Sequence, residues 1–195
     1  MNAVSGTARL PRFVLAVLAW LPVTFAVWYF AAPIILWPAT LIVDVIARVS
    51  LRDLVSTIEQ NAAIVAFTTT LKPGHAVAGG VVTVEVNELL YSFGLPMFAA
   101  LTLAAREPHW PRALAIGYAV LIPTVVWGVL ADFLKNVAIT AAPQVVSQTG
   151  FSPLSRELIV FAFQFGSLIL PAVAPAIVWV LTHRAFLERV RRAPA

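Results

Sequence analysis

Hydrophobic and polar positions along the chain alternate in long blocks, with four apolar runs separated by polar connections. The first run, 13–37, contains no charged residue in 25 positions, which is about 37 Å of helix and enough to cross a bilayer. The other runs cover 89–105, 113–134 and 158–181. The pattern predicts a mainly α membrane protein, a four-helix transmembrane bundle in a single integral membrane domain, 1–195.

The connection 38–88 is long enough to form a module outside the membrane, and its first part has helical periodicity. Leu41, Val45 and Val49 recur at helical spacing, while Asp44 and Arg48 fall on another face. We therefore expect an amphipathic helix, lying at the membrane interface, within the stretch 41–60.

The second part of this connection changes to a period of two. The stretches 64–72 and 81–87 are rich in β-branched residues and are joined by the turn-forming sequence KPGHAVAGG. Val65, Phe67, Thr69 and Leu71 share one face of the first stretch. The pattern predicts a small external β-ribbon, a two-stranded hairpin between the first two spans. Because an isolated hairpin is marginally stable, we expect it to pack on the membrane-embedded part or on a partner.

Composition agrees with a membrane location. Hydrophobic residues make up 61% of the chain and charged residues 11%, against about 25% charged in soluble domains. The lipid bilayer is therefore the expected surrounding. The sequence has no cysteine, which excludes disulfides, thiolate metal sites and cysteine nucleophiles.

The net charge of +4 has an explanation that does not involve nucleic acid, and no nucleic-acid partner is expected. With four crossings, one side of the membrane receives eight positive and two negative residues, a net charge of +6. The other side receives five positive and seven negative residues, a net charge of −2. Since lysine and arginine favour the cytoplasmic face, the pattern predicts a multi-pass protein of the inner membrane with both termini cytoplasmic.

The sequence offers no recognisable catalytic or ligand-binding motif. Three histidines are far apart, HExxH and phosphate-binding glycine motifs are absent, and the serines lack a GxSxG context. We expect no catalytic residue, no cofactor and no metal, hence a protein that is not an enzyme. Glu85 and Glu88 are expected to be solvated or structurally paired, and Asp132 and Lys135, three apart on one helix face, to pair with each other.

Gln164 is the most deeply placed polar side chain in the predicted spans. An amide within the hydrocarbon usually hydrogen-bonds to another helix, so we expect a packing interface at this position. Proline-kinked helices around Gln164 leave an alternative open, namely a small transporter or lipid-handling membrane protein. A polar tunnel that reaches Gln164 would favour this alternative.

Three segments together resemble a known family: the N-terminal FVLAVLAWLPVTFAVWYFAAP, the β-rich external stretch and, above all, VNELLYSFGLPMFAALTLA. Over most of the chain, the sequence looks like the exosortase H-associated membrane proteins. The resemblance implies a non-enzymatic accessory of the inner membrane in an exosortase-type protein-sorting system. Its partners would be an exosortase or the substrates that the exosortase sorts.

The exosortase enzyme itself resembles a cysteine transpeptidase, whereas this chain lacks cysteine, so no catalytic residue carries over. The segment that matches best supplies the candidate residues for a structural or partner-facing site. They are Asn87, Tyr91, Gly94, Leu95 and Pro96, to which the residue analysis adds Gln164.

Overall fold

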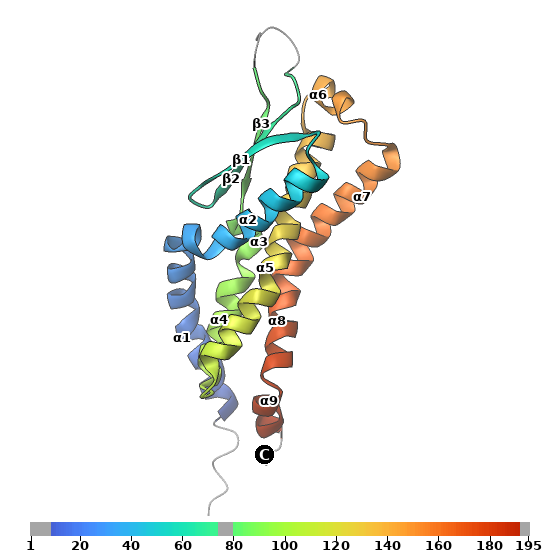
Figure 1. Ribbon diagram of the computed structural model, residues 1–195. Coiled ribbons are helices and arrows are strands. Elements are labelled where there is room, and N and C mark those ends of the chain that lie inside the picture. The colour runs from blue at the N-terminus through green and yellow to red at the C-terminus, as the bar shows by residue number, and fades with distance from the viewer. Residues whose placement is uncertain (1–8, 74–79, 192–195) are drawn as a thin grey trace, which may run out of the picture. The chain divides into compact units, whose positions relative to one another are not determined.

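The computed structural model of the protein describes residues 9–73 and 80–191, which are mostly helical (Figure 1). The N-terminal half contains α1 (Arg9–Phe30), α2 (Ala32–Ser50), β1 (Val55–Asn61), β2 (Ile64–Thr69), β3 (Thr83–Asn87), α3 (Leu89–Ser92) and α4 (Gly94–Ala105). The C-terminal half contains α5 (Trp110–Lys135), the π-helix η1 (Asn136–Thr140), α6 (Pro143–Gln148), α7 (Pro153–Gln164), the π-helix η2 (Phe165–Ile169), α8 (Leu170–Thr182) and α9 (Arg184–Arg191).

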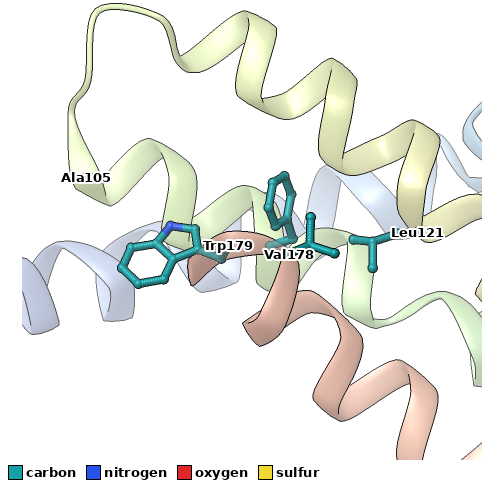
Figure 2. Close-up of a cluster of buried hydrophobic side chains, with 5 residues drawn as sticks. Ala105, Leu121, Val178 and Trp179 are labelled. Carbon is teal, nitrogen blue, oxygen red and sulfur yellow. The ribbon is translucent and has the colours of Figure 1, made fainter. Parts of the chain in front are cut away.

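The chain forms two compact units, and the first comprises residues up to 31, 93–121 and 172 onward. In this unit α1 packs along α4. Its core, shown in Figure 2, consists of Phe98, Ala105, Leu121, Val178 and Trp179. The Phe98 ring occupies the space where a Cβ on Gly117 would lie, so glycine lets α4 and α5 approach closely.

The second unit comprises residues 32–92 and 122–171 and contains the sheet. The three strands are antiparallel in the order β1-β2-β3. Val65, Phe67 and Val86 are fully buried, and the Phe67 ring stacks on Phe133 of α5 with 4.3 Å between the ring centroids. The four residues expected on one face of the first β-stretch, Val65 to Leu71 in steps of two, are all buried, which confirms that face.

Four helical stretches among the described residues are long and apolar enough to span a membrane. They are Pro11–Phe30, Ala32–Ser50, Trp110–Thr140 and Pro153–Thr182. The expected span 89–105 forms a shorter apolar stretch, Leu89–Ala105. The structure thus supports a membrane protein with four candidate spanning helices, although the set differs from the expected one.

The expected continuous helix 13–37 is two helices, which part at Ala31. Pro33 falls in the first turn of α2, where the missing N–H costs no helical hydrogen bond. Helix α2 then buries one stripe of side chains in the second unit: Ala32, Leu36, Ala39, Thr40, Val43 and Ala47. This tertiary packing defines α2 as a separate helix, which a count of uncharged positions does not reveal.

The expected helix within 41–60 ends at Ser50, and Val55–Asn61 is a strand. The sheet therefore has three strands and not two, and in chain order it follows both α1 and α2. The turn between β1 and β2 contains Ala62, whose φ of 55° lies in the left-handed region. A tight hairpin with alanine at this position lacks the glycine or asparagine signal that normally identifies such a turn.

Candidate functional site

Two of the predicted site residues lie in the second unit, at the exit from the sheet. Asn87 ends β3 and is exposed, and its Oδ1 accepts a hydrogen bond of 3.0 Å from the backbone N–H of Leu89. Asparagine thus caps the first turn of α3. Tyr91 follows on α3 and is only 2% exposed. Asn87 therefore starts the helix that buries Tyr91.

The other three residues of this segment open α4 in the first unit. Gly94 and Pro96 are buried, and Leu95 packs partly buried against the first-unit core. Pro96 lies in the first turn of the helix, where its missing N–H needs no partner. The segment that resembles the known family is thus divided between two units.

The Tyr91 side chain leads to a polar cluster at the end of α5. Its ring occupies the space where a Cβ on Gly128 would lie, and its hydroxyl donates a hydrogen bond to Asp132. Asp132 is 8% exposed and receives two further donors on Oδ1: Lys135 Nζ at 2.8 Å and Asn136 Nδ2 at 3.1 Å. The expected pairing of Asp132 with Lys135 is confirmed.

The cation of this pair has a second contact. Lys135 Nζ lies 4.1 Å from the centroid of the Phe163 ring, which presents its negative face to the ammonium. The Asp132 carboxylate thus has three hydrogen-bond donors, and the Lys135 ammonium contacts both this carboxylate and the Phe163 ring. Both charged groups have their partners within the fold. This arrangement is that of a structural polar cluster, which joins α3, α5, η1 and α7.

Glu88, adjacent to Asn87, is the least exposed carboxyl among the described residues, at 0%. Its Oε1 accepts a hydrogen bond of 3.0 Å from the Thr40 hydroxyl of α2, and Oε2 has no hydrogen-bond partner. Burial raises the pKa of Glu88 to about 7, against a smaller opposing effect of the Thr40 hydrogen bond. Of the two expected outcomes, solvation and structural pairing, the structure shows pairing.

The alternation of buried and exposed residues along β3 contained a signal for the burial of Glu88. Val86 is buried and Val84 is partly buried, whereas Glu85 and Asn87 are exposed. Extending this period of two by one step places Glu88 on the buried side. Treating Glu85 and Glu88 as an equivalent pair near the interface missed this difference.

Gln164 is exposed at the end of α7, so its amide is not buried against another helix in the described part of this chain, and the expected packing interface stays a prediction. Small residues form the contact between α5 and η2 instead. A Cβ on Gly166 would lie 3.2 Å from Gly128 Cα and 2.8 Å from Trp127 Cδ1. The Trp127 indole N–H also donates to the Ala162 carbonyl at 3.0 Å. Close approach through glycine is typical of helix packing in membranes.

One pocket of about 320 Å³ lies in the second unit, lined by residues of η1, α6 and α7. Its wall consists of Ala138, Ile139, Val146, Val160, Arg156 and Glu157. Gln164 is not among these residues, so this pocket is not the tunnel that the transporter alternative required.

The structure describes two of the three histidines. His75 lies outside the described residues, and His109 is exposed. His183, at 1% exposed, stacks on Trp179 with 5.3 Å between ring centroids, so its side chain belongs to the first-unit core. Burial lowers the pKa of His183, against opposing effects of the Trp179 carbonyl and of Glu107. Among residues 9–73 and 80–191, no group of three or more histidine, aspartate or glutamate side chains is arranged to hold a metal.

Comparison with known proteins gives one match. The family model of the exosortase H-associated membrane proteins matches residues 7–186, which is nearly the whole chain. Neither the curated proteins nor the solved structures contain a match to this sequence. On the strength of this coverage, the chain belongs to the exosortase H-associated membrane protein family.

Proposed function

We propose that this protein is a non-enzymatic accessory of an exosortase-type sorting system in the bacterial inner membrane, where it contacts exosortase H or the substrates of that enzyme. The observation that carries the proposal is the family match over residues 7–186. The sequence has no cysteine, so a cysteine transpeptidase reaction would take its nucleophile from another protein. The role left for this chain is binding and positioning.

The exposed edge of β3 supports a contact through the sheet. Two hydrogen bonds fix the pairing: Thr69 N–H to the Val82 carbonyl, and Glu88 N–H to the Ala63 carbonyl, both 2.9 Å. Because hydrogen-bonded positions alternate in an antiparallel ladder, Val84 and Val86 bond to β2.

The intervening residues Thr83, Glu85 and Asn87 then direct their backbone N–H and carbonyl groups away from β2. All three are exposed, and in the described part of the chain β3 pairs with no strand other than β2. An extended peptide can add to such an edge through main-chain hydrogen bonds. We propose this edge as the surface that receives a segment of the enzyme or of its substrate.

The proposed orientation keeps both termini in the cytoplasm. The proposed arrangement has four crossings: α1, the stretch Leu89–Ala105, α5 and the stretch Pro153–Thr182. The side of the membrane with a net charge of +6 is then the cytoplasmic side. In this arrangement α2 does not cross. Its exposed Trp37 and its Asp44–Arg48 ion pair of 2.8 Å suit the membrane interface.

The test is affinity capture of the tagged full-length protein from native membranes in mild detergent, in cells that express exosortase H, with partners identified by mass spectrometry. Glu85→Pro removes one edge N–H without removing a bond to β2. Because one hydrogen bond contributes about 1 kcal/mol, we expect about a fivefold loss of captured exosortase H or substrate.

Glu85→Ala is the matched control, since it removes the same side chain and keeps the N–H. Equal capture by both variants would show that the β3 edge is not the contact. Failure of the wild-type protein to capture exosortase H or a sorted substrate would overturn the proposed function itself.

A further inference from the structure

The pocket of the second unit is lined by four apolar residues and two charged ones. Ala138 and Ile139 come from η1, Val146 from α6, and Val160 from α7. Arg156 and Glu157 lie at neighbouring positions of α7. The pocket has a volume of about 320 Å³ and is widely open to its surroundings.

Arg156 supplies an unsatisfied cation to this pocket. Its Nε is buried and has no hydrogen-bond partner, and no ion pair of Arg156 with an acidic residue is found in the described part of the chain. A guanidinium has five N–H donors and binds phosphate through charge-assisted hydrogen bonds. The chemistry at this position therefore favours a phosphate or carboxylate group.

Glu157 limits which anion fits. This carboxylate lines the same pocket, is exposed, and forms no ion pair with a described cation. A ligand that is only anionic would meet attraction from Arg156 and repulsion from Glu157. A ligand with adjacent negative and positive groups would satisfy both side chains.

The position of the pocket along the chain indicates that its ligand is a lipid. The pocket lies where the candidate span Trp110–Thr140 ends and Pro153–Thr182 begins, a depth at which phospholipid headgroups are found. The side chains of Leu154, Leu158 and Phe161 are exposed and form an apolar surface on α7. Acyl chains can lie on such a surface while the headgroup enters the pocket.

We propose that this pocket binds one phosphatidylethanolamine molecule, with Arg156 on the phosphate and Glu157 on the ammonium. The primary ammonium donates hydrogen bonds to the carboxylate, whereas the quaternary ammonium of phosphatidylcholine has no N–H. Phosphatidylglycerol carries the phosphate without a cation for Glu157. The lipid site is independent of the proposed association with exosortase H.

The test is native mass spectrometry of the full chain in mild detergent with equal amounts of phosphatidylethanolamine, phosphatidylglycerol and phosphatidylcholine. We expect phosphatidylethanolamine to be retained preferentially. Arg156→Gln should reduce that retention about tenfold, the effect of losing a hydrogen bond to a charged group. Arg52→Gln is the matched control, because this arginine is exposed and lies outside the pocket.

Two further variants separate binding from misfolding. Glu157→Gln removes the carboxylate and should shift the preference toward phosphatidylglycerol, a gain that an unfolded protein does not produce. Val160→Trp should fill the pocket and reduce retention of all three lipids. Three results would overturn the proposal and identify adventitious lipid. They are equal retention of the three lipids by the wild-type protein, a wild-type preference for phosphatidylglycerol, and unchanged retention by Arg156→Gln.

Discussion

The Thr40 hydroxyl donates a hydrogen bond of 3.0 Å to Glu88 Oε1, which links the middle of α2 to the residue that follows β3. Both side chains are buried, and the second carboxyl oxygen of Glu88 has no partner. The link fastens the sheet to α2 through a carboxyl group that lacks the hydration an ionised form requires. This relationship makes the stability of the second unit sensitive to pH.

Glu88→Gln should remove that sensitivity. Because the pKa of Glu88 rises from 4.5 to about 7 on folding, the folded protein binds the proton more tightly than the unfolded chain between these values. The contribution of Glu88 to the free energy of unfolding therefore falls as pH rises from about 4.5 to 7, by about 3 kcal/mol in total. We expect Glu88→Gln to be more stable than wild type at pH 8, measured by thermal unfolding in detergent.

Glu85→Gln is the matched control, because Glu85 lies on the same strand with an exposed side chain. It should retain the pH dependence of the wild-type protein. A Glu88→Gln variant with an unchanged difference in stability between pH 5 and pH 8 would contradict a buried carboxyl that ionises at a cost.

Asp132→Asn should destabilise the second unit by about 2–3 kcal/mol, because it removes the charge that satisfies Lys135 and weakens the bond from Tyr91. The measurement is the midpoint of unfolding at neutral pH. Asp44→Asn tests a comparable ion pair on α2, whose partner Arg48 has a side chain 73% exposed. Solvent screens that pair, so little change is expected there. Similar losses in both variants would contradict the special role of Asp132.

The sequence was informative where local periodicity and final packing agree. The spacing of Asp132 and Lys135 on one helix face predicted their ion pair, and the alternation from Val65 to Leu71 predicted the buried side of β2 and of the residues that follow it. Both relationships depend on residues at most six positions apart. Such patterns survive in the folded protein when nothing from elsewhere in the chain competes with them.

Tertiary contacts decided the features that the sequence did not reveal. Strand β1 continues a stretch with helical spacing, and its pairing with β2 depends on a turn at Ala62 that lacks a glycine signal. The exposed position of Gln164 follows from packing through Gly128 and Gly166, which brings α5 and η2 together without the amide. Sequence periodicity does not specify which of several apolar faces meets a neighbouring helix.

Gly128→Ala should destabilise the protein by about 1–3 kcal/mol, because the new methyl group would overlap the Tyr91 ring. Unfolding of the purified variant in detergent provides the measurement. Ala176→Ser is a suitable control, since Ala176 is exposed on α8 and a small side chain there meets solvent or lipid. A Gly128→Ala variant as stable as this control would show that Tyr91 moves aside without cost.

His183→Phe should reduce the loss of stability on acidification. Burial lowers the pKa of His183 below 6.5, so the unfolded chain binds the proton more tightly and stability falls as pH drops below about 6.5. Phenylalanine keeps the stacking on Trp179 and carries no proton. Thermal unfolding at pH 5 and pH 7 measures the difference, with His109→Phe at an exposed position as the control. An acid response identical to wild type in His183→Phe would exclude this histidine as its source.

Gln164→Leu should leave the stability of the isolated protein unchanged and lower the capture of exosortase H from membranes. The amide is exposed within the candidate span Pro153–Thr182, so its removal breaks no packing in this chain. In the hydrocarbon an exposed amide lacks water, which favours a hydrogen bond to a helix of another protein. Leu168→Val, at an exposed apolar position of η2, provides the control for altered side-chain shape. Full capture by Gln164→Leu would remove Gln164 from the partner-facing surface, whereas a fall in stability would assign this amide a role within the fold.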